Sequence, residues 1–97
     1  MKEQAIEQFL VKGCQKRGWF CVKLAATGWA GMPDRMILGP GGKVCFVELK
    51  SPGKKPRKLQ SYRLQQLAGL GFWARVVDSK EGAQELMDDF GGMSHEV

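Results

Sequence analysis

The feature that most constrains the fold of this chain is the short run Val44-Cys45-Phe46-Val47-Glu48-Leu49-Lys50. The run is rich in β-branched and aromatic residues, which predicts a strand. Because side chains alternate across a strand, Glu48 and Lys50 are expected on the same face. An acid and a base two positions apart interrupt an otherwise apolar strand, and such local exceptions are expected at functional sites.

A hairpin brings a second acid to this strand. Asp34 begins another short apolar run, Met36-Ile37-Leu38, and the turn Gly39-Pro40-Gly41-Gly42-Lys43 links the two runs. Pairing them places Asp34 near Glu48, so that two carboxylates and the Lys50 ammonium share a small space. The linking turn has the glycines of a phosphate-binding loop, but it lacks the P-loop spacing and no helix follows it. We therefore predict a plain hairpin turn.

This group of side chains suits the hydrolysis of phosphodiesters. Two convergent carboxylates repel each other, and a divalent cation relieves the repulsion. Oxygen ligands suit Mg²⁺ or Mn²⁺, which polarises a phosphoryl oxygen and helps to deprotonate an attacking water. A nearby lysine stabilises the charge that builds on the phosphate. The alternative is an ordinary surface ion pair between Glu48 and Lys50, and the residues alone leave both interpretations open.

The ordered set of motifs resembles the PD-(D/E)XK nuclease superfamily, and more narrowly the VRR-NUC domain in its compact stand-alone viral and bacterial form. The matching residues are Glu7 in the predicted first helix, Gly31-Met32-Pro33-Asp34, Phe46-Val47-Glu48-Leu49-Lys50 and Gln60. The similarity extends from about Glu3 to about Glu81. Glutamate-x-lysine alone is common in strands, whereas the whole set in this order is specific.

The resemblance implies a Mg²⁺- or Mn²⁺-dependent endonuclease. By that resemblance Asp34 and Glu48 bind the metal together with the backbone carbonyl of Leu49, and Glu7 completes or supports the shell. Glu3 lies one helical turn from Glu7 and is the alternative acid of the first helix.

The resemblance also assigns roles beside the metal. Lys50 assists the water or stabilises the scissile phosphate, and Gln60 supports the site through hydrogen bonds. Asp34 and Glu48 count as catalytic as well as metal-binding residues.

Small stand-alone members of the family resemble homodimeric Holliday-junction resolvases. The expected protein is therefore a homodimer that cuts branched DNA, with two active sites related by a two-fold axis that nick opposing strands. No nucleotide cofactor is expected. Two alternatives stay open: a non-catalytic DNA-binding module, and an assembly subunit of a larger replication or repair complex.

The rest of the chain predicts an α/β fold. Helices are expected over residues 3–17, 56–70 and 80–90, and further strands over residues 19–24 and 72–77. The order α-β-β-β-α-β-α implies a mixed sheet with helices on each side, which is the restriction-endonuclease-like α-β-β-β-α-β core of the resembled superfamily. We expect one domain over residues 1–90 and a flexible tail over residues 91–97.

A basic loop follows the central strand. Two prolines and a glycine exclude regular structure from residues 51–58, and the cationic side chains of the segment can hold phosphates beside the acids. These side chains are Lys54, Lys55, Arg57 and Lys58. The net charge of +5 also favours an anionic partner such as DNA. The alternative is a solvated run of charges.

Two tryptophans and three thiols have expected positions as well. Trp29 lies in a loop of small residues over positions 25–31, where it either packs over the sheet edge or stacks on an unpaired base. Trp73 is expected in the core or at an interface. The three cysteines lack zinc-ligand spacing and are expected to be core or near-surface thiols. The only histidine, His95, lies in the polar tail, which argues against histidine-based nuclease chemistry.

No segment of this 97-residue chain approaches the roughly 18 apolar residues of a membrane span. Residues 1–4 show no signal-peptide pattern. We therefore expect a protein without membrane contacts, in the cytoplasm of a bacterial cell or of a phage-infected host.

Overall fold

The computed structural model describes residues 2–24 and 28–92. The order of its helices and strands is the predicted α-β-β-β-α-β-α order, which confirms the α/β fold. In chain order they are α1 (Glu3–Lys16), β1 (Phe20–Lys23), β2 (Arg35–Leu38), the 3-10 turn η1 (Pro40–Gly42), β3 (Val44–Leu49), α2 (Lys58–Gly69), β4 (Trp73–Val77) and α3 (Lys80–Gly92).

The four strands form one mixed sheet in the order β1-β2-β3-β4. β1 pairs with β2 and β2 with β3 in antiparallel fashion, while β3 and β4 are parallel. The predicted hairpin is confirmed, since Arg35 pairs with Val47 and Leu38 with Val44. Its turn closes through a 2.9 Å hydrogen bond from the Gly39 N–H to the Lys43 carbonyl. The parallel pair requires a crossover, and the basic loop and α2 supply it.

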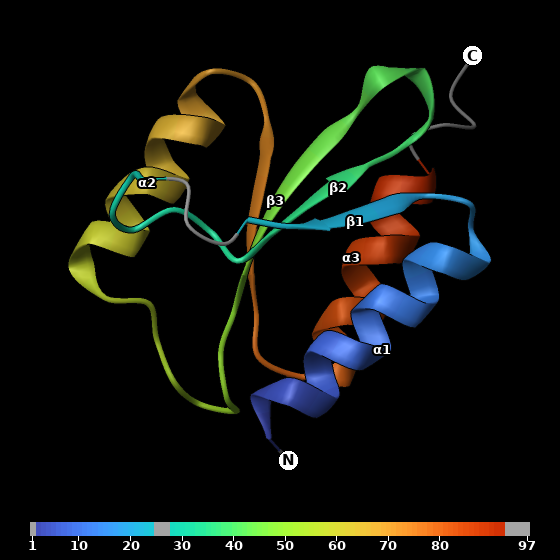
Figure 1. Ribbon diagram of the computed structural model, residues 1–97, viewed down its shortest axis with the longest axis horizontal. Helices are drawn as coiled ribbons and strands as arrows, with labels where there is room; N and C mark the ends of the chain where they lie inside the picture. The colour runs from blue at the N-terminus through green and yellow to red at the C-terminus, as the bar shows by residue number, and fades with distance from the viewer. Residues whose placement is uncertain (1, 25–27, 93–97) are drawn as a thin grey trace.

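Helices cover both faces of the sheet (Figure 1). α1 and α3 lie side by side on one face, and α2 lies on the other. Because side chains alternate along a strand, alternate residues of β3 face the α1–α3 layer and the α2 layer. Cys45, Val47 and Leu49 join the core beneath α1 and α3. Phe46 faces the other way and its ring meets that of Phe72 edge to face.

The core lies between the sheet and the α1–α3 pair. Ile6 and Leu10 of α1 are fully buried. Phe90 of α3 is also fully buried and meets the rings of Trp19 and Trp73 edge to face at centroid distances of 5.2 and 5.3 Å. Trp73 therefore packs against the core, as predicted.

Two predicted boundaries need correction. α2 begins at Lys58 rather than near Pro56, and α3 continues to Gly92. Gly91 was expected in the flexible tail, but it lies so close to Trp19 that an added Cβ would be 3.1 Å from the indole. This packing extends the helix by two residues past Phe90. Residues 25–27 of the predicted loop and residues 93–97 of the predicted tail, with His95, lie outside the described residues.

The cysteines are free thiols, with Cys14 and Cys45 buried and Cys21 partly buried. Burial raises the pKa of the Cys45 thiol to about 12. This placement agrees with the predicted core and near-surface thiols. Across residues 2–24 and 28–92, no helix is both long and apolar enough to cross a membrane.

Candidate active site

Asp34 lies where the β2–β3 hairpin opens. The pairing of Arg35 with Val47 places residue 34 opposite residue 48 on the neighbouring strand. The Asp34 Oδ2 accepts a 2.7 Å hydrogen bond from the Leu49 N–H, and the Asp34 carbonyl accepts one of 2.8 Å from the Leu24 N–H. These two bonds orient the carboxylate toward the end of β3.

Glu48 is the one charged residue that is buried in the described part of the chain, at 1% exposure. Its Oε2 lies 3.3 Å from the Lys50 Nζ, so the two side chains share a face as predicted. The Glu48 Oε1 is buried and makes no hydrogen bond. Burial raises the pKa of Glu48, the negative charge of Asp34 raises it further, and the hydrogen bond from Lys50 opposes both. The protein thus holds the Glu48 carboxylate in a place that disfavours its charge.

The two acids of α1 reach the same region but have different neighbours. Glu7 Oε2 forms a 2.9 Å ion pair with Arg35 Nε, and Arg35 Nη1 donates a 3.0 Å hydrogen bond to the Cys21 carbonyl. Glu3 is exposed, and its charge contributes to the raised pKa of Glu48. Sequence reasoning missed Arg35, although its position directly after Asp34 in a strand was a usable signal.

These acids border a cavity of about 270 Å³ at this end of the sheet. The residues that line it are Glu3, Glu7, Lys23, Leu24, Asp34 and Leu49. The cavity thus joins the α1 acids to Asp34.

The donor set fits a hard divalent cation that keeps much of its own water. Among the described residues, no three His, Cys, Asp or Glu side chains converge as a metal-binding group. Mg²⁺, however, is typically held by one or two carboxylates with water and phosphate oxygens. The unpartnered Glu48 Oε1 and the nearby Asp34 provide two such carboxylates. Ligation by Glu7 and by the Leu49 carbonyl stays a prediction.

Gln60 lies at the start of α2. Its Oε1 accepts a 2.8 Å hydrogen bond from the Arg57 N–H, which caps the first turn of the helix. The amide therefore has a structural contact, and its predicted supporting role in the site stays a prediction.

The basic loop leaves directly from β3. It begins beside a 3.0 Å hydrogen bond from the Lys50 N–H to the Val77 carbonyl, and it turns through a 2.9 Å bond from the Lys54 N–H to the Ser51 carbonyl. The cationic residues Lys54, Lys55, Arg57 and Lys58 are all exposed. Four cations thus lie on the segment that connects Lys50 to α2.

Trp29 does not pack over the sheet edge. Its side chain is 66% exposed and lies beside α2, where the Arg63 guanidinium is 5.5 Å from the ring centroid. The local sequence does not specify this contact, because Arg63 is distant along the chain.

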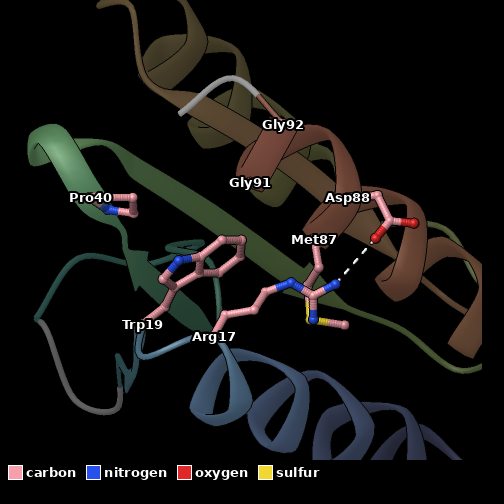
Figure 2. Close-up of a pocket in the computed structure, with 7 residues that line it drawn as sticks. All are labelled: Arg17, Trp19, Pro40, Met87, Asp88, Gly91 and Gly92. Carbon is pink, nitrogen blue, oxygen red and sulfur yellow. Dashed lines mark hydrogen bonds and ion pairs between the residues drawn. The ribbon is translucent and has the colours of Figure 1, made fainter. Parts of the chain in front are cut away.

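A larger cavity of about 540 Å³ lies near the opposite end of the β1–β2 pair (Figure 2). Its one lining carboxylate, Asp88, forms a 3.2 Å ion pair with Arg17, whose guanidinium also lies 5.6 Å from the Trp19 ring centroid. The lining of this larger cavity lacks the convergent carboxylates that metal-dependent hydrolysis needs. The candidate active site is therefore the smaller cavity, which Asp34 and Leu49 help to line, together with Glu48 and Lys50 at the same end of β3.

Known proteins resemble this chain in sequence and in fold. No protein-family model matches this sequence. A protein of Acyrthosiphon pisum secondary endosymbiont phage 1, named "Putative nuclease p44", is 38% identical over 81 residues, which cover 84% of this chain and 87% of the phage protein. A solved structure named "VRR_NUC domain" matches with a TM-score of 0.81 at 24% identity and covers 100% of this chain and 99% of its own. The structural match supports the fold.

Proposed function

This chain belongs to the VRR-NUC family, and we propose that it is a metal-dependent, structure-directed DNA endonuclease. It hydrolyses phosphodiester bonds in branched DNA such as Holliday junctions. The observation that carries the proposal is the buried Glu48, which has an unpartnered oxygen, a raised pKa and Asp34 as its acidic neighbour. Burying such a group costs free energy, and carboxyls with perturbed pKa values cluster at functional sites.

The side chains divide the work according to their contacts. Asp34 and Glu48 hold Mg²⁺ or Mn²⁺ together with the Leu49 carbonyl. The hydrogen bond from the Leu49 N–H keeps the Asp34 carboxylate in one orientation. When bound, the metal polarises a phosphoryl oxygen and lowers the pKa of water.

Lys50 carries the second part of the chemistry. Its ammonium lies 3.3 Å from Glu48 and balances that charge before substrate arrives. With substrate bound, Lys50 orients the attacking water or stabilises the charge on the scissile phosphate. Gln60 supports the site from the first turn of α2.

The α1 acids act around this centre. Glu7 supports the metal shell through Arg35, whose backbone follows Asp34 directly and whose side chain ties α1 to β1. Glu3 is the alternative acid, since its charge affects Glu48.

Substrate binding depends on the loop after β3. Lys54, Lys55, Arg57 and Lys58 contact the phosphates of the DNA on either side of the cut. We propose a homodimer, because two active sites about a two-fold axis can nick opposing strands of a junction. The enzyme acts in the cytoplasm of a bacterial or phage-infected cell.

Cleavage of a labelled four-way junction, beside a linear duplex of the same sequence, tests this proposal. Wild type, Glu48→Gln and the control Glu85→Gln, which alters an exposed glutamate of α3, are compared in Mg²⁺, Mn²⁺ and EDTA. We expect metal-dependent cutting of the junction that is lost only in Glu48→Gln. Cutting of flaps instead would retain the chemistry and change the substrate.

Failure of folded wild type to cut any DNA with either metal would contradict the proposal. Retained DNA binding would then favour the non-catalytic module. A lack of both binding and a stable dimer would favour the assembly subunit.

A further inference from the structure

The exposed side of α2 and residues 28–31 carry aromatic and cationic side chains that the proposed chemistry does not use. Trp29, Tyr62 and Arg63 form this group, which we call the stacking cluster. Trp29 is 66% exposed and Tyr62 is 53% exposed. The Arg63 guanidinium lies 5.5 Å from the centroid of the Trp29 ring, which is within the range of a cation–π contact.

Hydrogen bonds hold the stacking cluster in place. Arg63 Nε donates to the Ala30 carbonyl at 2.9 Å, and Arg63 Nη1 donates to Gln66 Oε1 at 2.9 Å. Gln66 Nε2 in turn donates to the Tyr62 hydroxyl at 3.3 Å. These bonds hold Arg63 beneath Trp29 and hold Tyr62 on the same side of α2, and side chains held before a ligand arrives lower the entropic cost of binding.

The stacking cluster lies beside the N-terminal end of α2, where the basic loop enters the helix. Gly31 touches Leu59 in the first turn of α2, and Figure 1 shows the segment 28–31 against this helix. Trp29 lies five residues before Asp34, and the basic loop enters α2 directly before Leu59. The N-terminal end of α2 thus lies between the basic loop and the stacking cluster.

We propose that the stacking cluster binds an unpaired base of the DNA substrate, with Trp29 as the stacking surface. Aromatic rings accept any base by stacking, and an arginine beside them adds a cation for the DNA backbone. The charge of the surrounding chain fits this ligand, because residues 51–77 contain six basic residues and no acidic one. The inference rests on the proposed function, since it takes DNA as the substrate. It narrows that substrate to DNA with unstacked bases at the branch.

Binding in EDTA separates this inference from catalysis. The probes are a duplex with splayed single-stranded arms and a fully paired duplex of equal length. The proteins are wild type, Trp29→Ala, Trp29→Phe and the control Phe20→Ala. Phe20 is 69% exposed, and its partner Leu38 lies at the opposite end of the β1–β2 pair from Arg35, the residue next to Asp34.

We expect Trp29→Ala to weaken binding of the splayed duplex about tenfold, the order of magnitude for the loss of one base stack. Binding of the paired duplex changes less than about twofold, because phosphate contacts dominate it. Trp29→Phe keeps a ring and stays within about threefold of wild type on both probes. Phe20→Ala matches wild type.

Equal losses on both probes, no loss on either, or the same loss in Phe20→Ala would overturn the inference. So would a wild type that binds both probes equally. Cleavage with Mg²⁺ or Mn²⁺ is then measured separately. If Trp29→Ala weakens binding of the splayed duplex alone but wild type cuts no DNA, the base-stacking role stands and the nuclease function is refuted. If wild type cuts DNA but Trp29→Ala binds both probes as wild type does, the nuclease function stands and the base-stacking role is refuted.

Discussion

Replacing Gly31 by alanine tests how the segment before Asp34 is held. Gly31 has a φ of +80°, and an added Cβ would lie 2.6 Å from Leu59 Cγ and 3.0 Å from the Leu59 carbonyl oxygen. The left-handed backbone costs an L-residue about 1–2 kcal/mol. Forcing a methyl group into packed atoms costs about 1–3 kcal/mol more. We therefore expect Gly31→Ala to lower the free energy of unfolding by about 2–5 kcal/mol, a large part of the roughly 5–15 kcal/mol typical of a domain.

Gly41→Ala is the matched control. Gly41 has a φ of +72°, but an added Cβ there meets nothing within 4 Å. This variant has only the backbone cost, so urea unfolding followed by circular dichroism should place it about 1–3 kcal/mol above Gly31→Ala. In thermal unfolding each kcal/mol corresponds to about 4–8 °C for a domain of this size. Equal stability of the two variants would refute the packing of Gly31 against α2.

A second substitution connects this packing to activity. Leu59→Ala removes the side-chain part of the clash and leaves the backbone oxygen, so the double variant Gly31→Ala/Leu59→Ala should be more stable than the two separate losses predict. Folded Gly31→Ala at low temperature should cut DNA more slowly than Gly41→Ala, because Gly31 lies between Trp29 and Asp34. Strictly additive losses would show that the two residues do not touch.

Four further predictions concern the chemistry, the stability and the DNA interface. Lys50→Ala should reduce cutting at least about 100-fold with binding kept within about twofold. Lys16→Ala, which removes an exposed charge of α1, is the control, and retained cutting in Lys50→Ala would remove Lys50 from the mechanism. Because burial and then Asp34 raise the pKa of Glu48, Mn²⁺ affinity measured by calorimetry should fall as pH is lowered through that pKa, and a pH-independent affinity would contradict this role. The raised pKa also means that folded protein binds the Glu48 proton more tightly than unfolded protein does. Protonated Glu48 therefore stabilises the metal-free protein at low pH, and this stabilisation should be lost as pH rises through the pKa of Glu48 in the folded state. The free energy of unfolding of Glu48→Gln should lack this change with pH. DNA affinity should fall steeply as the salt concentration rises. Replacing the basic residues of the loop 54–58 by alanine should reduce the slope of log binding constant against log salt concentration by about 0.9 for each DNA phosphate that the variant no longer neutralises. Salt-insensitive binding would exclude the loop from the interface.

Local patterns were sufficient for the centre of the candidate site. The period of two in β3 places Glu48 and Lys50 on one face, and their 3.3 Å contact agrees with it. The glycine-rich turn fixes the register of the hairpin, which places Asp34 opposite Glu48. These relations depend on residues close in the chain or paired through one turn, so the sequence by itself determined them.

The contacts around that centre depend on how separate elements pack. Glu7 and Arg35 meet because α1 packs on the sheet against β1 and β3, which flank β2. Trp29 meets Arg63 because its loop lies on α2. The last turn of α3 forms because Gly91 fits beneath Trp19. Helical and strand periodicities specify which face of an element is buried, but not which residue of another element it meets. The sequence therefore determined the fold and the acid–lysine centre. Only the tertiary structure decided that Glu7 is ion-paired, that Trp29 is exposed beside α2, and where the final helix ends.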